Sequence, residues 1–392
     1  MITPSQAEAL IQRTSLQPGV ESVLLSESLN RKLAENLVAD TDLPPFDRVM
    51  MDGIALRFSA IEKGIRSFQI QGVQRAGQAA LTLADEGACF EIMTGAVCSS
   101  GCDTVVPYEH IRIEDNVAHI DILPVAKGKN IHMQGSDKKA GALLVVAGSI
   151  ITPAEIGIAA SIGKSTLSVR RLPRVLICST GDELIDISET PLPHQIRRSN
   201  VHALQALIKS QGIEANSIHL ADDKTLLLEA LEKALNTYDV LILSGGVSKG
   251  KFDLIPEVLS ELGVETIFHT IAQRPGKPMW FGNTPKTVVF ALPGNPVSTL
   301  ACAARYVLPW LKEQLGMEPV EHRAHVQDTI TPHEKLTLFL PVRAMPSASI
   351  LQAEVLRNQG SGDFSGLSGM TGFIEVTPVN HSPAEFRYFP LG

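Results

Sequence analysis

Residues 238–253, YDVLILSGGVSKGKFD, combine an apolar strand with a glycine-rich turn. The unbroken apolar run 240–243 is typical of a parallel strand that is buried on both faces. Gly245, Gly246 and Gly250 can adopt positive φ, so successive N–H groups of the turn can point into one concavity. Hydroxyl groups and positive charge come from Ser244, Ser248, Lys249 and Lys251. The stretch therefore predicts a loop that binds a phosphate or another oxyanion.

Two later turns extend this predicted anion site. The segment RPGKP, residues 274–278, carries Arg274 and Lys277, and the segment LPGNPVS, residues 292–298, leaves a strand and begins a long helix. Helix N-termini favour anions. Because parallel strands end at one edge of a sheet, we expect the three turns to meet in one crevice. An ordinary P-loop is excluded, since Phe252 stands where the magnesium-binding Ser or Thr is required.

Composition narrows the class of protein. The chain has 392 residues, 44% hydrophobic and 19% charged, which is typical of a soluble globular protein with several domains. The formal net charge of −8 argues against a nucleic-acid binder. No apolar run approaches a membrane span, and the first residues, MITPSQAEALIQR, lack a signal-peptide pattern. We therefore expect a cytoplasmic protein without membrane or nucleic-acid partners.

The five cysteines are odd in number and scattered, so a disulfide framework is not expected. Cys98 and Cys102, with His110 as a third ligand, present a possible metal site. No second Cys or His pair follows at zinc-finger spacing, however, and ordinary buried or loop thiols are the favoured interpretation.

The hydrophobic periodicity predicts a multidomain α/β plus β protein. Residues 5–40 are expected to be mainly helical, whereas residues 54–125 alternate as short strands and residues 141–163 show a strand followed by a Pro-initiated helix. Alternating strands and helices over residues 174–316 predict a doubly wound parallel sheet, and the strand patterns beyond residue 319 predict a small β-barrel or sandwich. The predicted domains are 1–45 with 126–172 (α+β), 46–125 (an inserted β-rich module), 173–317 (α/β) and 318–392 (β-barrel-like).

Acidic residues cluster in the predicted turns. They are Asp52, Asp137, Asp182, Glu183, Asp222, Asp223 and Asp253. We assign Asp222 to capping of the following helix. If the others converge beside the glycine-rich loop, they can hold Mg²⁺, which prefers carboxylate and phosphate oxygens. Such an ion would stabilise the charge that develops on a phosphate leaving group.

Short motifs along almost the whole chain resemble one family. They are PPFD (44–47), MDG (51–53), MTGA (93–96), DTVV (103–106), STGDE (179–183), SGGVS (244–248), PGKP (275–278), LPGNPVS (292–298) and QGSG (359–362). In this order they are similar to the molybdopterin molybdenumtransferase family, the type of MoeA and of the gephyrin E-domain. The α/β region is similar to that family's molybdopterin-binding domain.

The resemblance implies an activity and its partners. Molybdenum from molybdate would enter the dithiolene of adenylylated molybdopterin, and AMP would be released with the help of Mg²⁺. The subunit would have four parts and would form an elongated homodimer. Possible protein partners are a molybdopterin adenylyltransferase and the molybdoenzymes that receive the product.

The resemblance also implies roles for individual residues. The catalytic set would be Asp52, Asp137, Glu183, Asp223, Asp253 and Lys277, with Asp223 and Asp253 as metal ligands. Thr94 would join the polar groups of the cleft, and Arg274 would hold phosphate or molybdate oxygens in place of a usual lysine. The loop residues Ser244, Gly245, Gly246 and Ser248 would cradle the pterin phosphate, and the remaining cofactor contacts would come from Pro293, Gly294, Asn295 and Ser298.

Several positions depart from the family pattern. They are Arg48, Val49, Ile54, His132, Ser136, Arg198 and Lys251. Most of these residues remove negative charge or add positive charge, which would weaken metal binding and strengthen anion binding. An alternative function is therefore a non-catalytic paralogue that binds a phosphorylated pterin or a nucleotide. A third hypothesis, a scaffold that contacts molybdoenzymes through its C-terminal β domain, has no peptide-groove signature in its favour.

Overall fold

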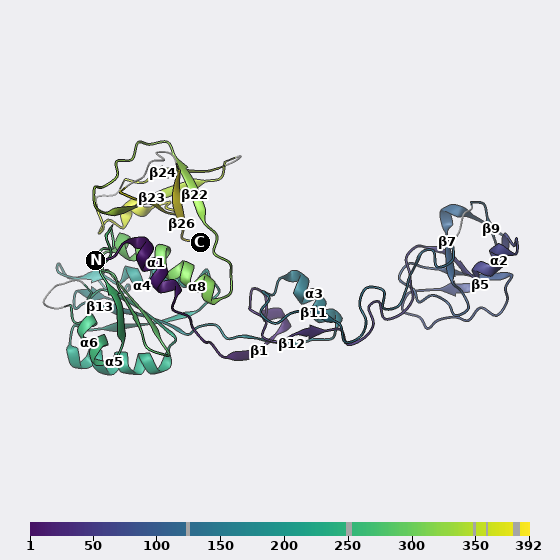
Figure 1. Ribbon diagram of the computed structural model, residues 1–392, viewed down its shortest axis with the longest axis horizontal. Helices are drawn as coiled ribbons and strands as arrows, with labels where there is room; N and C mark the ends of the chain where they lie inside the picture. Colours follow the sequence, from purple (N-terminus) through teal and green to yellow (C-terminus); the bar gives the residue numbers. More distant parts are fainter. Residues whose placement is uncertain (123–125, 248–252, 348–349, 358–359, 379–384) are drawn as a thin grey trace. The chain divides into compact units, whose positions relative to one another are not determined.

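The computed structural model describes the chain except for residues 123–125, 248–252, 348–349, 358–359 and 379–384 (Figure 1). The described residues form two compact units. The first unit comprises Met1–Glu21 and Arg170–Gly392, and the second comprises Ser22–Val169. Each unit contains its own clusters of buried apolar side chains. The four-domain division is finer than this one and stays a prediction.

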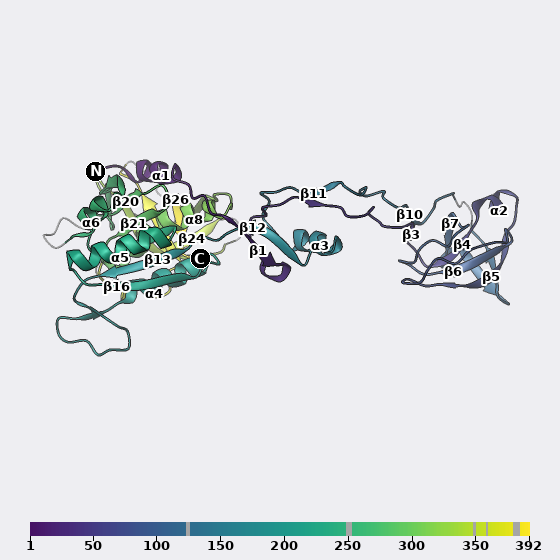
Figure 2. The ribbon, with the colours of Figure 1, turned by 90° about the horizontal axis from the view of Figure 1, so that it is seen from below.

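A six-stranded sheet forms the centre of the first unit, with the strand order β16-β13-β17-β21-β20-β18. Its strands are β13 (Val175–Thr180), β16 (Ala215–Leu220), β17 (Val240–Ser244), β18 (Glu265–His269), β20 (Trp280–Asn283) and β21 (Val288–Leu292). Strands β16, β13, β17 and β21 run parallel, and β20 is antiparallel to both of its neighbours. Figure 2 shows β16 on one side of this sheet and β20 on the other. Since β16 and β17 flank β13, the winding direction reverses between β13 and β17, which is where open α/β sheets bind ligands.

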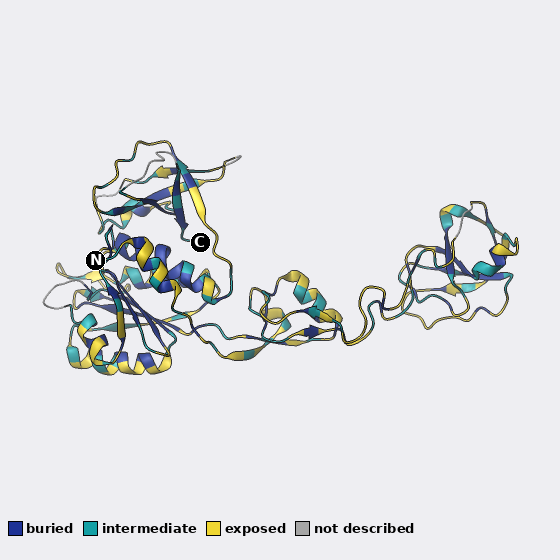
Figure 3. Ribbon diagram, viewed as in Figure 1, coloured by how far each residue is buried: buried dark blue, intermediate teal, exposed yellow. Residues whose placement is uncertain are grey.

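Helices cover both faces of this sheet. One face carries α4 (Ser199–Lys209), α7 (Pro296–Cys302), a π-helical segment (Ala303–Val307) and α8 (Leu308–Gln314), and the other carries α5 (Lys224–Thr237) and α6 (Ile255–Glu261). Alternate residues of β17 enter different clusters: Val240 and Ile242 pack with α4 and α8, and Leu241 and Leu243 pack with α5 and α6. Figure 3 shows the central strands of this sheet buried and exposed residues on the outer sides of the helices. This explains the unbroken apolar run, since both faces of the strand are covered.

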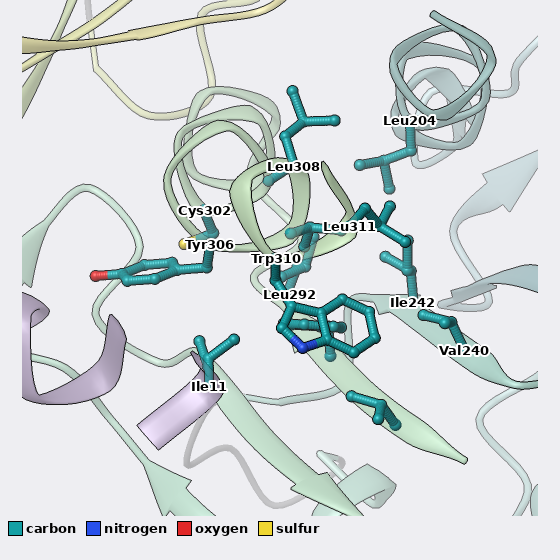
Figure 4. Packing of buried hydrophobic residues seen from close by; sticks show 14 of the residues in the cluster. Ile11, Leu204, Val240, Ile242, Leu292, Cys302, Tyr306, Leu308, Trp310 and Leu311 are labelled. Carbon is teal, nitrogen blue, oxygen red and sulfur yellow. The ribbon is translucent and has the colours of Figure 1, made fainter. Parts of the chain in front are cut away.

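The N-terminal helix α1 (Pro4–Gln12) completes the core on the α8 side. Its start is fixed by a capping box between Thr3 and Gln6. Ile11 is 2% exposed and belongs to the cluster shown in Figure 4, and Trp310 of α8 donates from Nε1 to the Thr14 carbonyl at 2.7 Å. Burying a side chain such as Ile11 contributes about 2 kcal/mol. Residues far apart in the sequence are thereby held in one folded unit.

The C-terminal strands close into a barrel of five strands. They are β22 (His322–Val326), β23 (Thr337–Met345), β24 (Leu351–Val355), β25 (Gly372–Val376) and β26 (Glu385–Pro390). The ring closes because β23 pairs with both β24 and β25. A short strand from the α/β region, β19 (Gln273–Arg274), pairs with β23. The predicted doubly wound sheet and C-terminal β domain are therefore confirmed, the latter as a barrel.

Buried charges join the barrel to α1. Arg305 is 1% exposed, and its Nη2 lies 2.7 Å from Glu8 Oε2. Arg387 of β26 also contacts Glu8, at 3.1 Å, and Glu375 of β25 lies 3.6 Å from Arg305. Burial acts to raise the pKa of Glu8, but the hydrogen bonds and charges of Arg305 and Arg387 outweigh it and lower the pKa to about 2. Removing one member would leave a buried charge without compensation, which is strongly destabilising.

The second unit contains a curled six-stranded sheet with the order β7-β4-β6-β5-β9-β8. Its elements are β4 (Gly53–Leu56), α2 (Phe58–Glu62), β5 (Ser67–Gln74), β6 (Ala88–Ile92), β7 (Thr104–Pro107), β8 (Ile111–Glu114) and β9 (Val117–Ile120). The apolar side chains of Ile54, Leu56, Phe68 and Val106 fill one side of it. The strands predicted for residues 54–125 are therefore confirmed over the part of that range that is described.

Short pairs of strands and the helix α3 make up much of the remaining described part of the second unit. They are β1 (Val20–Leu24) with β12 (Thr166–Arg170), β2 (Leu37–Val38) with β11 (Leu143–Val145), β3 (Arg48–Val49) with β10 (Ile131–His132), and α3 (Pro153–Ser161). The predicted strand and Pro-initiated helix in residues 141–163 are confirmed.

The mainly helical interpretation of residues 5–40 is wrong beyond α1. Residues 28–38 are extended or turned, and their backbone bonds go to remote segments, as in the bridge from Leu33 to Val169. Leu33 and Leu37 are buried against Val145 and Ala159, whereas Leu29, which a helix would place on the same face, is 46% exposed. A spacing of four can therefore also arise from an extended chain that crosses a small core.

Candidate functional site

A cavity of about 680 Å³ opens in the first unit at the carboxyl ends of β13, β17 and β21. Its walls come from the ends of these strands, the start of α4 and the turn before α7. The residues that line it include Thr180, Glu183, Arg197, Arg198, Asn200, Asp222, Ser244, Gly245, Gly246, Asp253, Pro278, Pro293, Gly294 and Asn295. This is the edge at which the sequence predicts an anion site.

Glycine is required on the floor of the cavity. Gly245 has φ 105° and Gly246 has φ 67°, a region that favours glycine. A Cβ on Gly245 would lie 2.8 Å from the carbonyl oxygen of Thr180, and one on Gly246 would lie 2.8 Å from Ile255. A Cβ on Gly294 would lie 3.6 Å from the Cα of Gly245, so the first and third predicted turns lie side by side. Gly245 and Gly246 are half-buried and line the cavity, so the backbone of this floor is accessible to a ligand.

Asn200 at the start of α4 links three parts of the cavity wall. Its Nδ2 lies within hydrogen-bond distance of Ser244 Oγ (3.0 Å), the Gly294 carbonyl oxygen (2.7 Å) and Thr299 Oγ1 (3.2 Å). Within the described part of the chain, Asn200 Oδ1 and Thr180 Oγ1 are buried without a hydrogen-bond partner. Buried polar groups normally have partners, so these two atoms are available to a polar ligand. The sequence reasoning missed Asn200, whose only signal was its place at a predicted helix start.

One wall of the cavity is acidic. Glu183, Asp222 and Asp253 line it, and the neighbouring Asp182 accepts a hydrogen bond through Oδ1 from the Asp222 N–H at 3.2 Å. Burial raises the pKa of Asp222, and the negative charges of Asp182, Glu183 and Asp253 raise it further. These carboxylates are therefore close enough to repel one another, and a cation or a proton would relieve the repulsion.

The prediction that Asp222 caps the following helix is wrong. Asp223 is the N-cap of α5, and its Oδ1 accepts from the N–H groups of Thr225 (2.9 Å) and Leu226 (3.0 Å). Asp222 lies one residue earlier and lines the cavity. Two adjacent aspartates at a helix start do not reveal from sequence which one turns inward, because either can occupy the N-cap.

Among the described residues that line the cavity, Arg197 and Arg198 carry positive charge, and the predicted contributors Lys249 and Lys251 lie outside the described residues. Arg198 Nη2 forms an ion pair with Asp186 at 2.5 Å. Lys277 and Arg274 are exposed and are not part of the lining, although Pro278 is. Arg274 lies on β19 beside the barrel strand β23. Ser298 is buried in α7 at 4% exposure, and Ser248 lies outside the described residues.

The remaining predicted site residues belong to the second unit. Asp52 Oδ1 accepts from both the N–H (2.6 Å) and the Oγ1 (2.7 Å) of Thr94, and the backbone bond is the main cause that lowers the Asp52 pKa. Asp137 Oδ1 lies 2.8 Å from His132 Nε2. The sequence thus identified two residues, Asp52 and Thr94, that contact each other from motifs 42 positions apart.

The described residues contain neither a preformed cluster of metal ligands nor a helix that could span a membrane. There, no group of three or more His, Cys, Asp or Glu side chains is arranged to hold a metal ion. Cys98 and Cys102 are free thiols, and burial is the main cause that raises their pKa, to about 11 and about 12. No helix in the described part of the chain has the length and apolar character needed to cross a membrane.

Comparison with known proteins gives the family. Residues 2–163 match the family model described as the MoeA N-terminal region (domain I and II), and residues 176–313 match a probable molybdopterin binding domain. A molybdopterin molybdenumtransferase of Synechocystis sp. is 41% identical over 100% of this chain and 99% of that protein. The chain belongs to the molybdopterin molybdenumtransferase family. The resemblance inferred from the motifs is confirmed.

Two further relatives of this transferase family support the assignment. A molybdopterin molybdenumtransferase of Nostoc sp. is 33% identical, covering 82% of this chain and 76% of that protein. The crystal structure of a molybdopterin biosynthesis MoeA protein from Pyrococcus horikosii superposes with a TM-score of 0.83 at 28% identity, covering 100% of this chain and 99% of that one. This likeness confirms the multidomain fold class.

In this member of the transferase family, some of the predicted site residues line the cavity and others do not. The structure brings Glu183, Asp253, Ser244, Gly245, Gly246, Pro293, Gly294 and Asn295 together around one cavity. It places Asp223, Lys277, Arg274 and Ser298 outside the lining, and Asp52, Thr94 and Asp137 in the second unit. Their predicted roles stay predictions.

Proposed function

We propose that this chain acts as a molybdopterin molybdenumtransferase, which inserts molybdenum from molybdate into adenylylated molybdopterin and releases AMP. The observation that carries the proposal is the cavity at the ends of β13, β17 and β21, where glycine backbone faces a group of carboxylates. Family membership supports the same reaction. A phosphate-bearing substrate needs both an anion cradle and a way to stabilise charge on the leaving phosphate.

The cavity residues have distinct tasks in this proposal. The turn of Gly245 and Gly246, which lines the cavity, accommodates the substrate phosphate, and glycine is needed there because any Cβ would collide with Thr180 or Ile255. Asn200 holds that turn against the Gly294 turn, so the cradle is preorganised before the substrate binds. Arg197 and Arg198 supply positive charge at the cavity wall. Asn295 and Pro293 belong to the Gly294 turn and complete the lining.

The donor set on the acidic wall fits Mg²⁺. This ion is usually bound by one or two carboxylates together with substrate phosphates. Burial raises the pKa of Asp222 and the charges of Asp182, Glu183 and Asp253 raise it further, which supports binding of a cation at this wall. Asp222 and Asp253 would hold it together with the substrate phosphate, with Asp222 in the place first assigned to Asp223, and Glu183 lines the same cavity. When bound, Mg²⁺ would neutralise charge on the phosphate that leaves as AMP.

The finer expectations remain part of the proposal. We infer that Asp52, Thr94 and Asp137 contribute polar groups to catalysis, and that Lys277 and Arg274 hold anionic oxygens near the cavity. A homodimer and contacts with a molybdopterin adenylyltransferase and with molybdoenzymes are implied by the family resemblance. A cytoplasmic location remains the expectation from the sequence pattern. Light scattering of the purified protein tests the dimer.

Release of AMP tests the proposed function. Purified protein is incubated with adenylylated molybdopterin, Mg²⁺ and molybdate, and AMP is quantified by chromatography. AMP that forms only when molybdate and Mg²⁺ are both present supports the transfer reaction. Tight binding of the adenylylated ligand without any AMP release would instead identify a non-catalytic binding protein.

A further inference from the structure

The loop that carries Asp137 is fastened to residues 42–47 by hydrogen bonds. They run from Gln134 N to Asp47 Oδ1 (2.8 Å), from Asp137 N to the Leu43 carbonyl (2.9 Å) and from Ala140 N to Asp42 Oδ1 (2.9 Å). These bonds fix the backbone of Asp137, but they leave its side chain, which is 55% exposed, free to rotate. A second set of contacts restrains the carboxylate.

Arg48 and His132 provide those contacts. The two residues are register partners in the antiparallel pair β3 and β10, so their side chains lie on the same face. His132 Nε2 lies 2.8 Å from Asp137 Oδ1, and His132 Nδ1 lies 3.3 Å from Arg48 Nη2. Arg48, His132 and Asp137 therefore form a continuous chain of polar contacts.

The chemistry of arginine determines which group donates in each of these polar contacts. A guanidinium group offers N–H donors and no acceptor. Arg48 must therefore donate to His132 Nδ1, which leaves the imidazole proton on Nε2. His132 then donates from Nε2 to Asp137 Oδ1. If the proton were on Nδ1 instead, two donors would face each other on the Arg48 side, and Nε2 would face a carboxylate without a proton.

We propose that Arg48 and His132 are positioning residues for Asp137: Arg48 selects the Nε2–H tautomer of His132, and His132 holds one carboxylate oxygen so that the other is presented in a fixed direction. This inference rests on the proposed function, in which Asp137 contributes to catalysis. The structure shows that Arg48 and His132 contact each other, so the two residues form one device.

The tautomer is tested first, without any activity assay. Full-length protein labelled with ¹⁵N-histidine gives long-range ¹H–¹⁵N spectra that distinguish the two neutral tautomers, and His132→Gln identifies the His132 signal by its loss. We expect the Nε2–H tautomer in the wild type and a shift toward a tautomer mixture in Arg48→Met. An Nδ1–H tautomer in the wild type, or a spectrum that Arg48→Met leaves unchanged, would overturn the proposal.

Kinetics then test positioning. A glutamine amide can donate to Asp137 from about the same place as His132 Nε2, whereas leucine cannot. We expect His132→Leu to lower kcat for AMP release by about tenfold or more with little change in KM, as is usual for the loss of such an orienting partner. His132→Gln should recover most of this loss. Equal losses in both variants would refute the positioning role.

A matched control and a separate failure outcome complete the test. His119 of β9 contacts Ser67 at 2.8 Å in the same unit, and His119→Gln should leave kcat within about twofold. If the wild type releases no AMP at all, the proposed function fails, and the tautomer spectra still decide whether Arg48 controls His132.

Discussion

Asn200 Nδ2 lies 2.7 Å from the carbonyl oxygen of Gly294, and this contact ties the start of α4 to the turn between β21 and α7. The same nitrogen lies 3.0 Å from Ser244 Oγ at the end of β17. One side chain thus spans loops that are 94 and 44 positions away in the sequence. The shape of the cavity depends on this small network.

Asn200→Ala should loosen the cavity. The substitution removes the shared donor and leaves partly buried acceptors unsatisfied, at a cost of about 1 to 3 kcal/mol. We expect the affinity for AMP, measured by titration calorimetry, to fall by about tenfold. His202→Ala changes an exposed residue on the same helix and should bind AMP normally. Unchanged AMP affinity in Asn200→Ala would show that the network does not shape the site.

A comparison of Gly245→Ala with Gly212→Ala separates the effect of backbone strain from the effect of losing the cavity floor. Gly245 (φ 105°) and Gly212 (φ 76°) both adopt positive φ, which costs an alanine about 1 kcal/mol or more. A Cβ on Gly212 meets nothing within 4 Å, whereas one on Gly245 meets the Thr180 carbonyl at 2.8 Å. Both variants should therefore lose thermal stability, but only Gly245→Ala should lose AMP binding. Equal binding by the two variants would contradict a phosphate site on this turn.

Asp222→Asn and Asp223→Asn distinguish the two adjacent acids. Asparagine caps helices about as well as aspartate, so Asp223→Asn should preserve α5 and leave Mg²⁺ binding nearly unchanged. Asp222→Asn removes one of several repelling charges; it should raise the melting temperature without Mg²⁺ and weaken Mg²⁺ binding in the presence of AMP by about tenfold. The reverse pattern would restore Asp223 as the metal ligand.

Asp239 should make stability depend on pH. Burial acts to raise its pKa, but hydrogen bonds from Arg171 (2.9 Å) and Arg174 outweigh burial and lower the pKa to about 2. Because the pKa is depressed in the folded state, the ionised group stabilises the fold above its unfolded pKa of about 4, and this stabilisation is lost as the pH falls toward about 2.

Asp239→Asn should therefore lower stability at pH 7 by about 2 kcal/mol, and the difference from wild type should shrink between about pH 4 and pH 2. Thermal melting at a series of pH values measures both effects. Glu214→Gln, which breaks an exposed ion pair with Lys209, is the control and should change stability by less than about 1 kcal/mol. A difference that stays constant with pH would mean that the Asp239 charge does not stabilise the fold.

Local patterns predicted much of the fold. The run of residues 240–243 identified β17, because a strand covered on both faces carries apolar side chains on both sides. The glycines after it identified the cavity floor, because their conformation is a local property of the backbone. The helical prediction for residues 28–38 was wrong, because their buried leucines pack against remote strands and the sequence does not show those partners.

The polar part of the cavity was predicted less completely. Asn200 and Arg197 have no motif of their own, and their importance arises from which loops the sheet brings together, whereas Arg198 was recognised only as a departure from the family pattern. Asp222 and Asp223 are equivalent as candidates for the helix cap until the backbone direction is known. Sequence thus identified the residues with unusual backbone, and the structure was needed for side chains whose role depends on tertiary contacts.

A crystal structure with the adenylylated molybdopterin ligand bound would show directly where its phosphate lies. We expect density for the ligand's phosphate against the turn of Gly245 and Gly246, with Asn200 beside it and Asp222 and Asp253 facing the same group. Ligand phosphate density elsewhere on the protein, with this cavity filled only by solvent, would contradict this expectation.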